Sequence, residues 1–99
     1  MAVQYVVRIT PRALKDLQDI FDYIAKDSPQ NAAGMISRLL AAIRELDHLP
    51  FRHPVPRRGR RRSALFRCMP VGNYLVTYRI EKAARVVRVV DVRHGARQR

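Results

Sequence analysis

The last third of the chain, residues 64–97, constrains the fold most, because it predicts three consecutive strands joined by two short turns. We expect strands at 64–69, 73–80 and 85–93, with turns at 70–73 and 81–84. In the third strand, one face would carry Val87, Val89 and Asp91, and the other Val86, Arg88, Val90 and Val92. Apolar residues on both faces predict that this strand lies inside a sheet and not at its edge. Short connections between successive strands predict an antiparallel meander.

The first half of the chain predicts a layer that could cover this meander. Alternation from Val3 to Ile9 indicates a strand, and the pairs Thr10-Pro11 and Ser28-Pro29 are typical starts of helices. Apolar residues recur at helical spacing after each start. On the first helix, the side away from this apolar stripe is expected to face water and carries Asp16, Asp19 and Asp22. A short joint between two amphipathic helices predicts an antiparallel helical hairpin.

The order of elements is therefore strand, helix, helix and three strands, which predicts an α+β fold in a single domain over residues 1–99. We expect the N-terminal strand to lie beside the last strand. The helical hairpin would then cover one face of the sheet and leave the other face cationic.

Cysteine content, hydropathy and motifs exclude several classes of protein. Cys68 is the only cysteine, so no intramolecular disulfide can form, which is typical of a reducing compartment. No apolar run approaches the roughly 20 residues that span a bilayer, and we expect a soluble, cytoplasmic protein. The chain has no HExxH, CxxC, P-loop or GxGxxG motif, so we expect neither a metal nor another cofactor.

The positive charge is confined to the second half of the chain. Residues 1–49 contain six basic and six acidic residues, so the whole net charge of +12 belongs to residues 50–99. Such an asymmetry predicts an anionic partner, either nucleic acid or an acidic protein surface. The alternative is a small basic protein whose charge serves only solubility.

Residues 50–63 are predicted to form a loop, because three prolines, one glycine and six arginines leave no periodicity. The densest charge of the chain lies here, at Arg57, Arg58, Arg60, Arg61 and Arg62. This run is a candidate site for phosphate or for an acidic partner. It could equally be a solvated connector, because a short arginine run is a weak motif.

His94 is the best candidate for proton transfer, because an imidazole can gain or lose a proton near neutral pH. The alternative is a histidine at the end of a strand that hydrogen-bonds to the backbone. A phosphate or a pentacoordinate intermediate could be neutralised by Arg67, Arg79, Arg93 and Arg97. Cys68 lies within a predicted strand and fits packing better than nucleophilic catalysis.

Four stretches together resemble the ParE/RelE superfamily of type II toxin–antitoxin toxins, which are also known as plasmid-stabilisation proteins. They are ALKDLQDIFDYIAKDSPQNA at 13–32, LLAAIRELDHLP at 39–50, LFRCMPVGNYLVTYRI at 65–80 and VVRVVDVRHGAR at 86–97. The likeness is greatest to the ParE branch, in which an ADLxxIxxYI-like helix, an SPxxA joint and a VxHxxR-like end recur.

The resemblance implies a growth-inhibiting toxin that a cognate ParD-like antitoxin neutralises. An acidic C-terminal segment of that antitoxin would wrap the toxin and occupy its basic and apolar grooves. ParE-like members inhibit DNA gyrase, whereas RelE-like members cleave mRNA on the ribosome without a metal. In the ribonuclease branch, the resemblance places catalytic residues at Arg67 and His94, with Arg97 close by.

The chain departs from the ribonuclease pattern in one respect. No Asp, Glu or Lys lies between Asp47 and Glu81, where such enzymes commonly have a general base, and arginine is effectively always protonated. We therefore favour gyrase inhibition, with ribosome-dependent cleavage of mRNA as the alternative, and it stays open whether the protein is an enzyme. The residues expected to bind a target or partner are Arg57, Arg58, Arg60, Arg61, Arg62, Arg79, Arg93, His94 and Arg97. A non-toxic basic module that binds nucleic acid ranks third, because neither an aromatic RNA-binding strand nor a recognition helix is evident.

Overall fold

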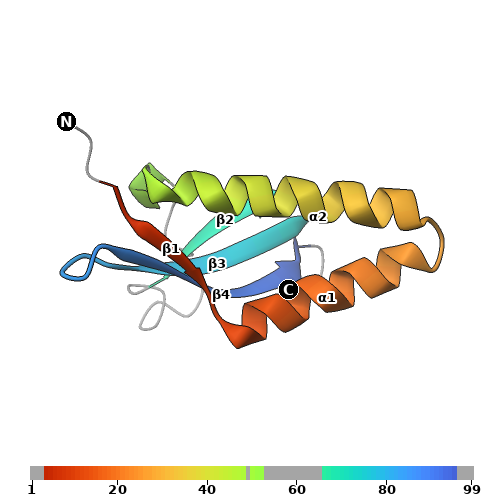
Figure 1. Ribbon diagram of the computed structural model, residues 1–99, viewed down its shortest axis with the longest axis horizontal. Coiled ribbons are helices and arrows are strands. Elements are labelled where there is room, and N and C mark those ends of the chain that lie inside the picture. The colour runs from red at the N-terminus through yellow and green to blue at the C-terminus, as the bar shows by residue number, and fades with distance from the viewer. Residues whose placement is uncertain (1–3, 49, 53–65, 96–99) are drawn as a thin grey trace.

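The computed structural model describes residues 4–48, 50–52 and 66–95. Its elements are β1 (Val6–Ile9), α1 (Pro11–Ala25), α2 (Pro29–Arg44), the 3-10 helices η1 (Glu45–Asp47) and η2 (Pro50–Arg52), β2 (Arg67–Val71), β3 (Tyr74–Glu81) and β4 (Val86–His94). The four strands form one sheet in the order β1-β4-β3-β2, in which β1 pairs with β4 in parallel and the other pairs are antiparallel (Figure 1). The predicted α+β fold is confirmed, as are the position of β1 beside the last strand and the internal position of β4.

Both helices begin at the predicted caps. The Thr10 hydroxyl accepts a hydrogen bond from the backbone N–H of Ala13 at 3.2 Å, and the Ser28 hydroxyl accepts one from Asn31 at 3.1 Å. Each cap is worth about 1 kcal/mol of helix stability. The helices form a hairpin whose turn lies at the opposite end of the molecule from the β3–β4 turn (Figure 1).

The core lies between the helical hairpin and one face of the sheet. α1 contributes Ala13 and Leu17, and α2 contributes Leu39 and Ile43. The sheet contributes the residues of alternate positions, namely Met69, Val71, Tyr74, Val76, Tyr78, Val87, Val89 and Val92. Because every strand except β1 places buried residues in this layer, the sheet and the hairpin share one core.

A β-bulge in β4 makes one prediction about its faces wrong. Thr77 pairs with Asp91 while Tyr78 pairs with Val89, so Val90 is an extra residue on β4. Past this point the alternation is reversed: Val92 is buried in the core, whereas Asp91 lies on the opposite face and not, as predicted, with Val87 and Val89. The bulge therefore decides which residues at the end of β4 face the helices.

The turns and the edge strand differ from the prediction in detail. β2 extends to Val71 and includes Pro70, which had been assigned to a turn. Proline is tolerated there because β2 is an edge strand in the sheet of the described residues, so no ladder bond has to be donated on its outer side. The turn that follows is only two residues, and Gly72 has φ +58, a conformation that favours glycine.

The start of the predicted loop at 50–63 is helical. Pro50–Arg52 form η2, and the buried Tyr78 hydroxyl donates a hydrogen bond to the carbonyl oxygen of Pro50. This bond ties η2 to the middle of the sheet. The arginine run from 57 to 62 lies outside the described residues.

Tyr78→Phe should lower the free energy of unfolding by roughly 1–3 kcal/mol, because the buried Pro50 carbonyl loses its donor. Urea denaturation followed by circular dichroism measures the change. Tyr23→Phe is the matched control, since Tyr23 is 64% exposed and should leave the stability unchanged. Equal midpoints for the Tyr78→Phe variant and the wild type would contradict the role of this bond.

Candidate functional site

The two residues predicted as a catalytic pair lie apart. Arg67 pairs with Tyr78 across the sheet, and His94 pairs with Tyr74, four residues further along β3. Strand geometry therefore separates the Cα atoms of Arg67 and His94 by about 16 Å. Arg97 and the arginines from 57 to 62 lie outside the described residues, so the structure does not place them.

Arg67 is held near η2 and not near His94. Its Nη1 donates a hydrogen bond to the carbonyl oxygen of Phe51 at 3.4 Å, and its guanidinium carbon lies 5.3 Å from the centroid of the Phe51 ring. Lys82 approaches the same ring at 5.6 Å, and Tyr5 packs edge-on against it at 6.1 Å. The Phe51 ring thus makes cation–π contacts with the side chains of Arg67 and Lys82. The sequence did not indicate this role.

Arg79 lies on the face of the sheet away from the helices. It belongs to a row of arginines across three strands, because Arg8 pairs with Arg88 and Arg88 with Arg79. Glu81 bridges two members of this row: Arg88 Nε and Arg79 Nη2 each lie 3.0 Å from its carboxylate. Hydrogen bonding from Arg88 is the largest cause that lowers the pKa of Glu81, and the same bond raises the pKa of Arg88.

The predicted cationic face is therefore built of partly neutralised arginines. Arg93, further along β4, lies on the same face, with its Nε 3.5 Å from the Asp91 carboxylate. The side chain of Arg93 is 47% exposed, and those of Arg79 and Arg88 are 43% and 38% exposed. These guanidinium groups are held in place by carboxylates and still reach solvent.

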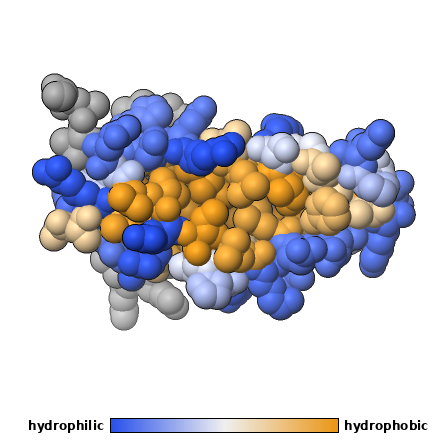
Figure 2. All heavy atoms as spheres, in the orientation of Figure 1, coloured by the Kyte–Doolittle hydropathy of each residue, from blue (hydrophilic) through white to orange (hydrophobic). Residues whose placement is uncertain are grey.

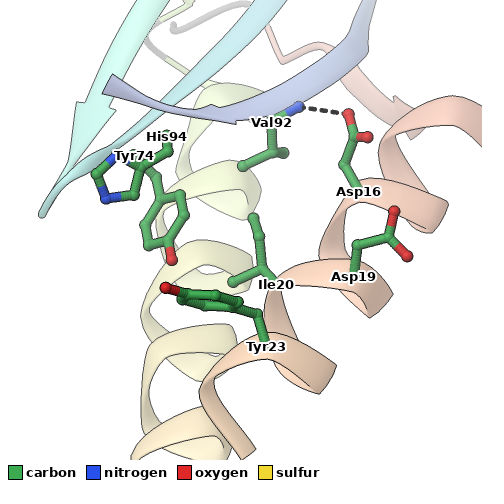
Figure 3. Close-up of a pocket in the computed structure, with 7 residues that line it drawn as sticks. All are labelled: Asp16, Asp19, Ile20, Tyr23, Tyr74, Val92 and His94. Atoms are coloured by element: carbon green, nitrogen blue, oxygen red, sulfur yellow. Dashed lines mark hydrogen bonds between the residues drawn. The ribbon is translucent and has the colours of Figure 1, made fainter. Parts of the chain in front are cut away.

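His94 points the other way, toward α1, because the bulge places Val92 and His94 on the helix side. Its ring packs edge-on against Tyr74, with the ring centroids 5.2 Å apart. Together with residues of α1 it lines a pocket of about 240 Å³ (Figure 3). We call it the tyrosine pocket; it is lined by Asp16, Asp19, Ile20, Tyr23, Tyr74, Val92 and His94. The side chains of His94 and Arg93 thus lie on opposite faces of the sheet, although both had been predicted to belong to one basic cluster.

Asp16 was expected to face water, and this expectation is wrong. Its carboxylate turns to the sheet and accepts a hydrogen bond from the backbone N–H of Val92 at 3.0 Å (Figure 3), and its side chain is only 18% exposed. The two residues are 76 positions apart in the chain, so no local pattern could have indicated the contact. The carboxylate satisfies a backbone donor just beyond the bulge.

A second cavity lies between the two helices. It has a volume of about 350 Å³, and its lining is Leu14, Leu17, Gln18, Phe21, Ile36 and Leu40. Figure 2 shows a hydrophobic band along the space between α1 and α2, with hydrophilic side chains on both flanks. Leu14, which lines this cavity, is 54% exposed. We call this cavity the helical groove, and an exposed apolar surface of this kind is typical of a site where a partner binds.

None of the helices in the described part of the chain is long and apolar enough to span a bilayer.

Glu81→Gln should lower the stability of the protein at neutral pH. The difference in stability between the variant and the wild type should disappear in acid. Because the pKa of Glu81 is lowered in the folded state, its ion pairs contribute stability above the unfolded value of about 4.3, and this contribution disappears as the pH falls through the folded pKa. Thermal unfolding of both proteins between pH 7 and pH 3 measures the difference. A difference that stays constant over this range would contradict the ion-pair role.

Comparison with known proteins gives consistent matches over most of the chain. Residues 7–99 match the family of ParE toxins of the type II toxin–antitoxin system parDE. A protein named "Putative toxin Y4kP" from Sinorhizobium fredii (strain NBRC 101917 / NGR234) is 34% identical over 92 residues, which cover 93% of this chain and 90% of that protein.

Solved structures are similar as well. The chromosomal ParDE system of P. aeruginosa matches with a TM-score of 0.77 at 12% identity, over 94% of this chain and 98% of that chain, which is a likeness of fold. The toxin–antitoxin complex RelBE2 of Mycobacterium tuberculosis matches with a TM-score of 0.63 at 27% identity, over 93% and 99% of the two chains.

Proposed function

Because the chain belongs to the ParE family of type II toxin–antitoxin toxins, we propose that it inhibits DNA gyrase in the cytoplasm and that a cognate antitoxin neutralises it. The match to the ParE family over residues 7–99 carries this proposal. ParE-like members act on gyrase by binding and need no catalytic group of their own.

The geometry of the described residues supports a binding function over catalysis. Cleavage of RNA at a 2′-OH needs a proton acceptor and a phosphate-binding cation within reach of one phosphate group. The Cα atoms of the predicted pair, Arg67 and His94, are about 16 Å apart. The guanidinium group of Arg67 donates a hydrogen bond to the carbonyl oxygen of Phe51. The arginines of the open sheet face are instead spaced along a surface, which suits contact with a large anionic partner.

A ribosome-dependent ribonuclease of the RelE type is the second candidate. The observation that favours it is the 27% identity to the RelBE2 toxin–antitoxin complex over most of both chains. In this case Arg67, His94 and Arg97 would form the site, and no metal would take part. Arg67 and His94 would have to approach one another when RNA binds.

One paired assay distinguishes the two candidates. Purified protein is added to a gyrase supercoiling reaction, and in parallel to ribosomes that carry a defined mRNA. We expect inhibition of supercoiling with intact mRNA. Cleavage of the mRNA at codon-phased positions, with gyrase unaffected, would establish the ribonuclease instead.

Arg93→Ala should raise the concentration needed for half inhibition of gyrase by roughly tenfold, because the loss of one charge-assisted contact costs about 1.5 kcal/mol or more. The supercoiling assay measures the effect. Arg44→Ala is the control, since Arg44 is also exposed but lies at the end of α2, away from the open sheet face. Equal inhibition by the two variants would remove Arg93 from the proposed contact.

The antitoxin is proposed to occupy the helical groove. Its apolar lining and the exposed Leu14 suit the apolar face of a helical segment. The arginines of the second half of the chain would meet acidic residues of the same partner. The solved relatives are themselves toxin–antitoxin systems, which supports such a partner for this chain.

Leu14→Ser should weaken antitoxin binding about 10- to 100-fold, because burial of a leucine side chain is worth about 1.5–3 kcal/mol. Isothermal titration calorimetry with the antitoxin encoded beside this protein gives the dissociation constant. Val6→Ser is the control: Val6 is 53% exposed, as apolar as Leu14, and lies on β1 outside the groove. If both variants bind like the wild type, the antitoxin does not use the groove.

A further inference from the structure

Three arginines lie next to one another on the face of the sheet away from the helices. Arg8 of β1 pairs with Arg88 of β4, and Arg88 pairs with Arg79 of β3. Neighbouring strands are only about 4.8 Å apart, so like charges that lie opposite one another across a sheet destabilise it. Threonine at these positions would suit a strand without this cost. A ligand therefore explains the row better than stability does.

The carboxylates of the protein neutralise only part of the charge of this row. Glu81 pairs with Arg79 and Arg88, each through a nitrogen 3.0 Å from its carboxylate. Arg8 is exposed, and no acidic side chain in the described part of the chain pairs with it. The side chains of Arg79 and Arg88 remain 43% and 38% exposed. Because a guanidinium group has five N–H donors, both can bond to a ligand while they stay paired with Glu81.

A fourth arginine is held in a strained backbone conformation at the same end of the sheet. Arg85 is the last residue of the turn between β3 and β4, and its φ of 56° lies in the left-handed region that favours glycine. Its carbonyl oxygen accepts a hydrogen bond from the N–H of Val6 at 2.9 Å, but any residue could make this backbone bond. Arg85 is exposed, and none of the described carboxylates pairs with it. An arginine at a position where glycine would be less strained indicates a role for the side chain.

The four arginines form one surface, which we call the basic sheet end: Arg8, Arg79, Arg85 and Arg88. It includes the β3–β4 turn, which lies at the opposite end of the molecule from the turn between the helices (Figure 1). Four guanidinium groups with one carboxylate suit a partner whose negative charge is dense and continuous. A DNA duplex carries one negative charge per about 1.7 Å of its axis, and the planar guanidinium group matches the geometry of a phosphate. Duplex DNA is also the substrate of gyrase, so it is present where the proposed target works.

We propose that the basic sheet end binds the phosphate backbone of the DNA duplex on which gyrase acts, an inference that rests on the function proposed above. The toxin would then contact DNA and gyrase at the same time. The helical groove lies on the other side of the molecule and stays available to the antitoxin. Binding would not depend on the DNA sequence, because contacts between arginine and phosphate do not read the bases.

Binding to a fluorescein-labelled DNA duplex of mixed sequence, followed by fluorescence anisotropy at increasing KCl concentration, tests this contact. Arg8→Ala and Arg85→Gly are the test variants, because neither removes an ion pair from the described part of the fold. Each should weaken binding roughly three- to tenfold and reduce the slope of log affinity against log salt concentration by about 1, since one phosphate contact is lost. Arg38→Ala is the matched control and should leave the slope unchanged. It removes the same charge, but the Arg38 guanidinium group lies beside Gly72, at the other end of β3.

Arg85→Gly also separates DNA binding from stability. Glycine relieves the strain at this φ, so the variant should melt a few degrees higher than the wild type although it binds DNA less tightly. Thermal unfolding followed by circular dichroism measures the shift. A lower melting temperature together with weaker binding would assign the loss to the fold and contradict the role of the Arg85 side chain.

The gyrase supercoiling assay with the same variants separates this inference from the proposed function. If Arg8→Ala and Arg85→Gly both bind DNA more weakly and inhibit gyrase less, the DNA contact serves inhibition. If they bind DNA like the wild type, or if Arg38→Ala reduces the salt slope equally, the proposed DNA contact is wrong. Weaker inhibition of gyrase would then assign these arginines to an acidic surface of gyrase itself, and the proposed function would stand. If the wild type binds DNA through these arginines but does not inhibit gyrase, the DNA surface stands and the proposed function fails.

Discussion

The attachment of α1 to the edge of β4 is the constraint on which the rest of the structure depends. β1 pairs with β4 only as far as Val89. Beyond this point, α1 lies beside β4 and hydrogen-bonds to its backbone. Thr10 donates its hydroxyl to the Val90 carbonyl oxygen at 3.1 Å, and the Asp16 carboxylate accepts from the Val92 N–H at 3.0 Å. These two bonds hold the strand on both sides of the bulge. Without the bulge, His94 would face the other side of the sheet, and the tyrosine pocket would lose a wall.

The general fold follows from local patterns, whereas the site does not. Cap residues, helical spacing and strand alternation are short-range signals, and they predicted the element order and the neighbours of β4 correctly. The bulge at Val90 is a feature of the pairing between β4 and β3, and the regular alternation of β4 carried no sign of it. Pro70 was assigned to a turn because its place on an edge strand depends on the order of the whole sheet. The Asp16 side chain was predicted to face water because its hydrogen-bond partner, the backbone N–H of Val92, is 76 residues away in the chain.

Charge is organised differently on the two faces of the sheet. On the open face, carboxylates such as Glu81 and Asp91 orient arginines without neutralising all of them, which leaves a positive surface with defined geometry. On α1, the carboxylates of Asp16 and Asp19 pair with Arg12 and Lys15 of the same helix.

The pairing of the first strand with the last has a consequence for how the protein folds. Contacts such as that between Thr10 and Val90 join residues 80 positions apart, so a long loop must close before the core is complete. Folding is expected to be slow for a chain of this size, because non-local pairing delays the formation of the core. Until β4 is in place, the helical hairpin exposes its apolar stripe to solvent, and this nascent state is the one most prone to aggregate. A partner that binds the hairpin early would therefore act as a folding aid as well as an inhibitor.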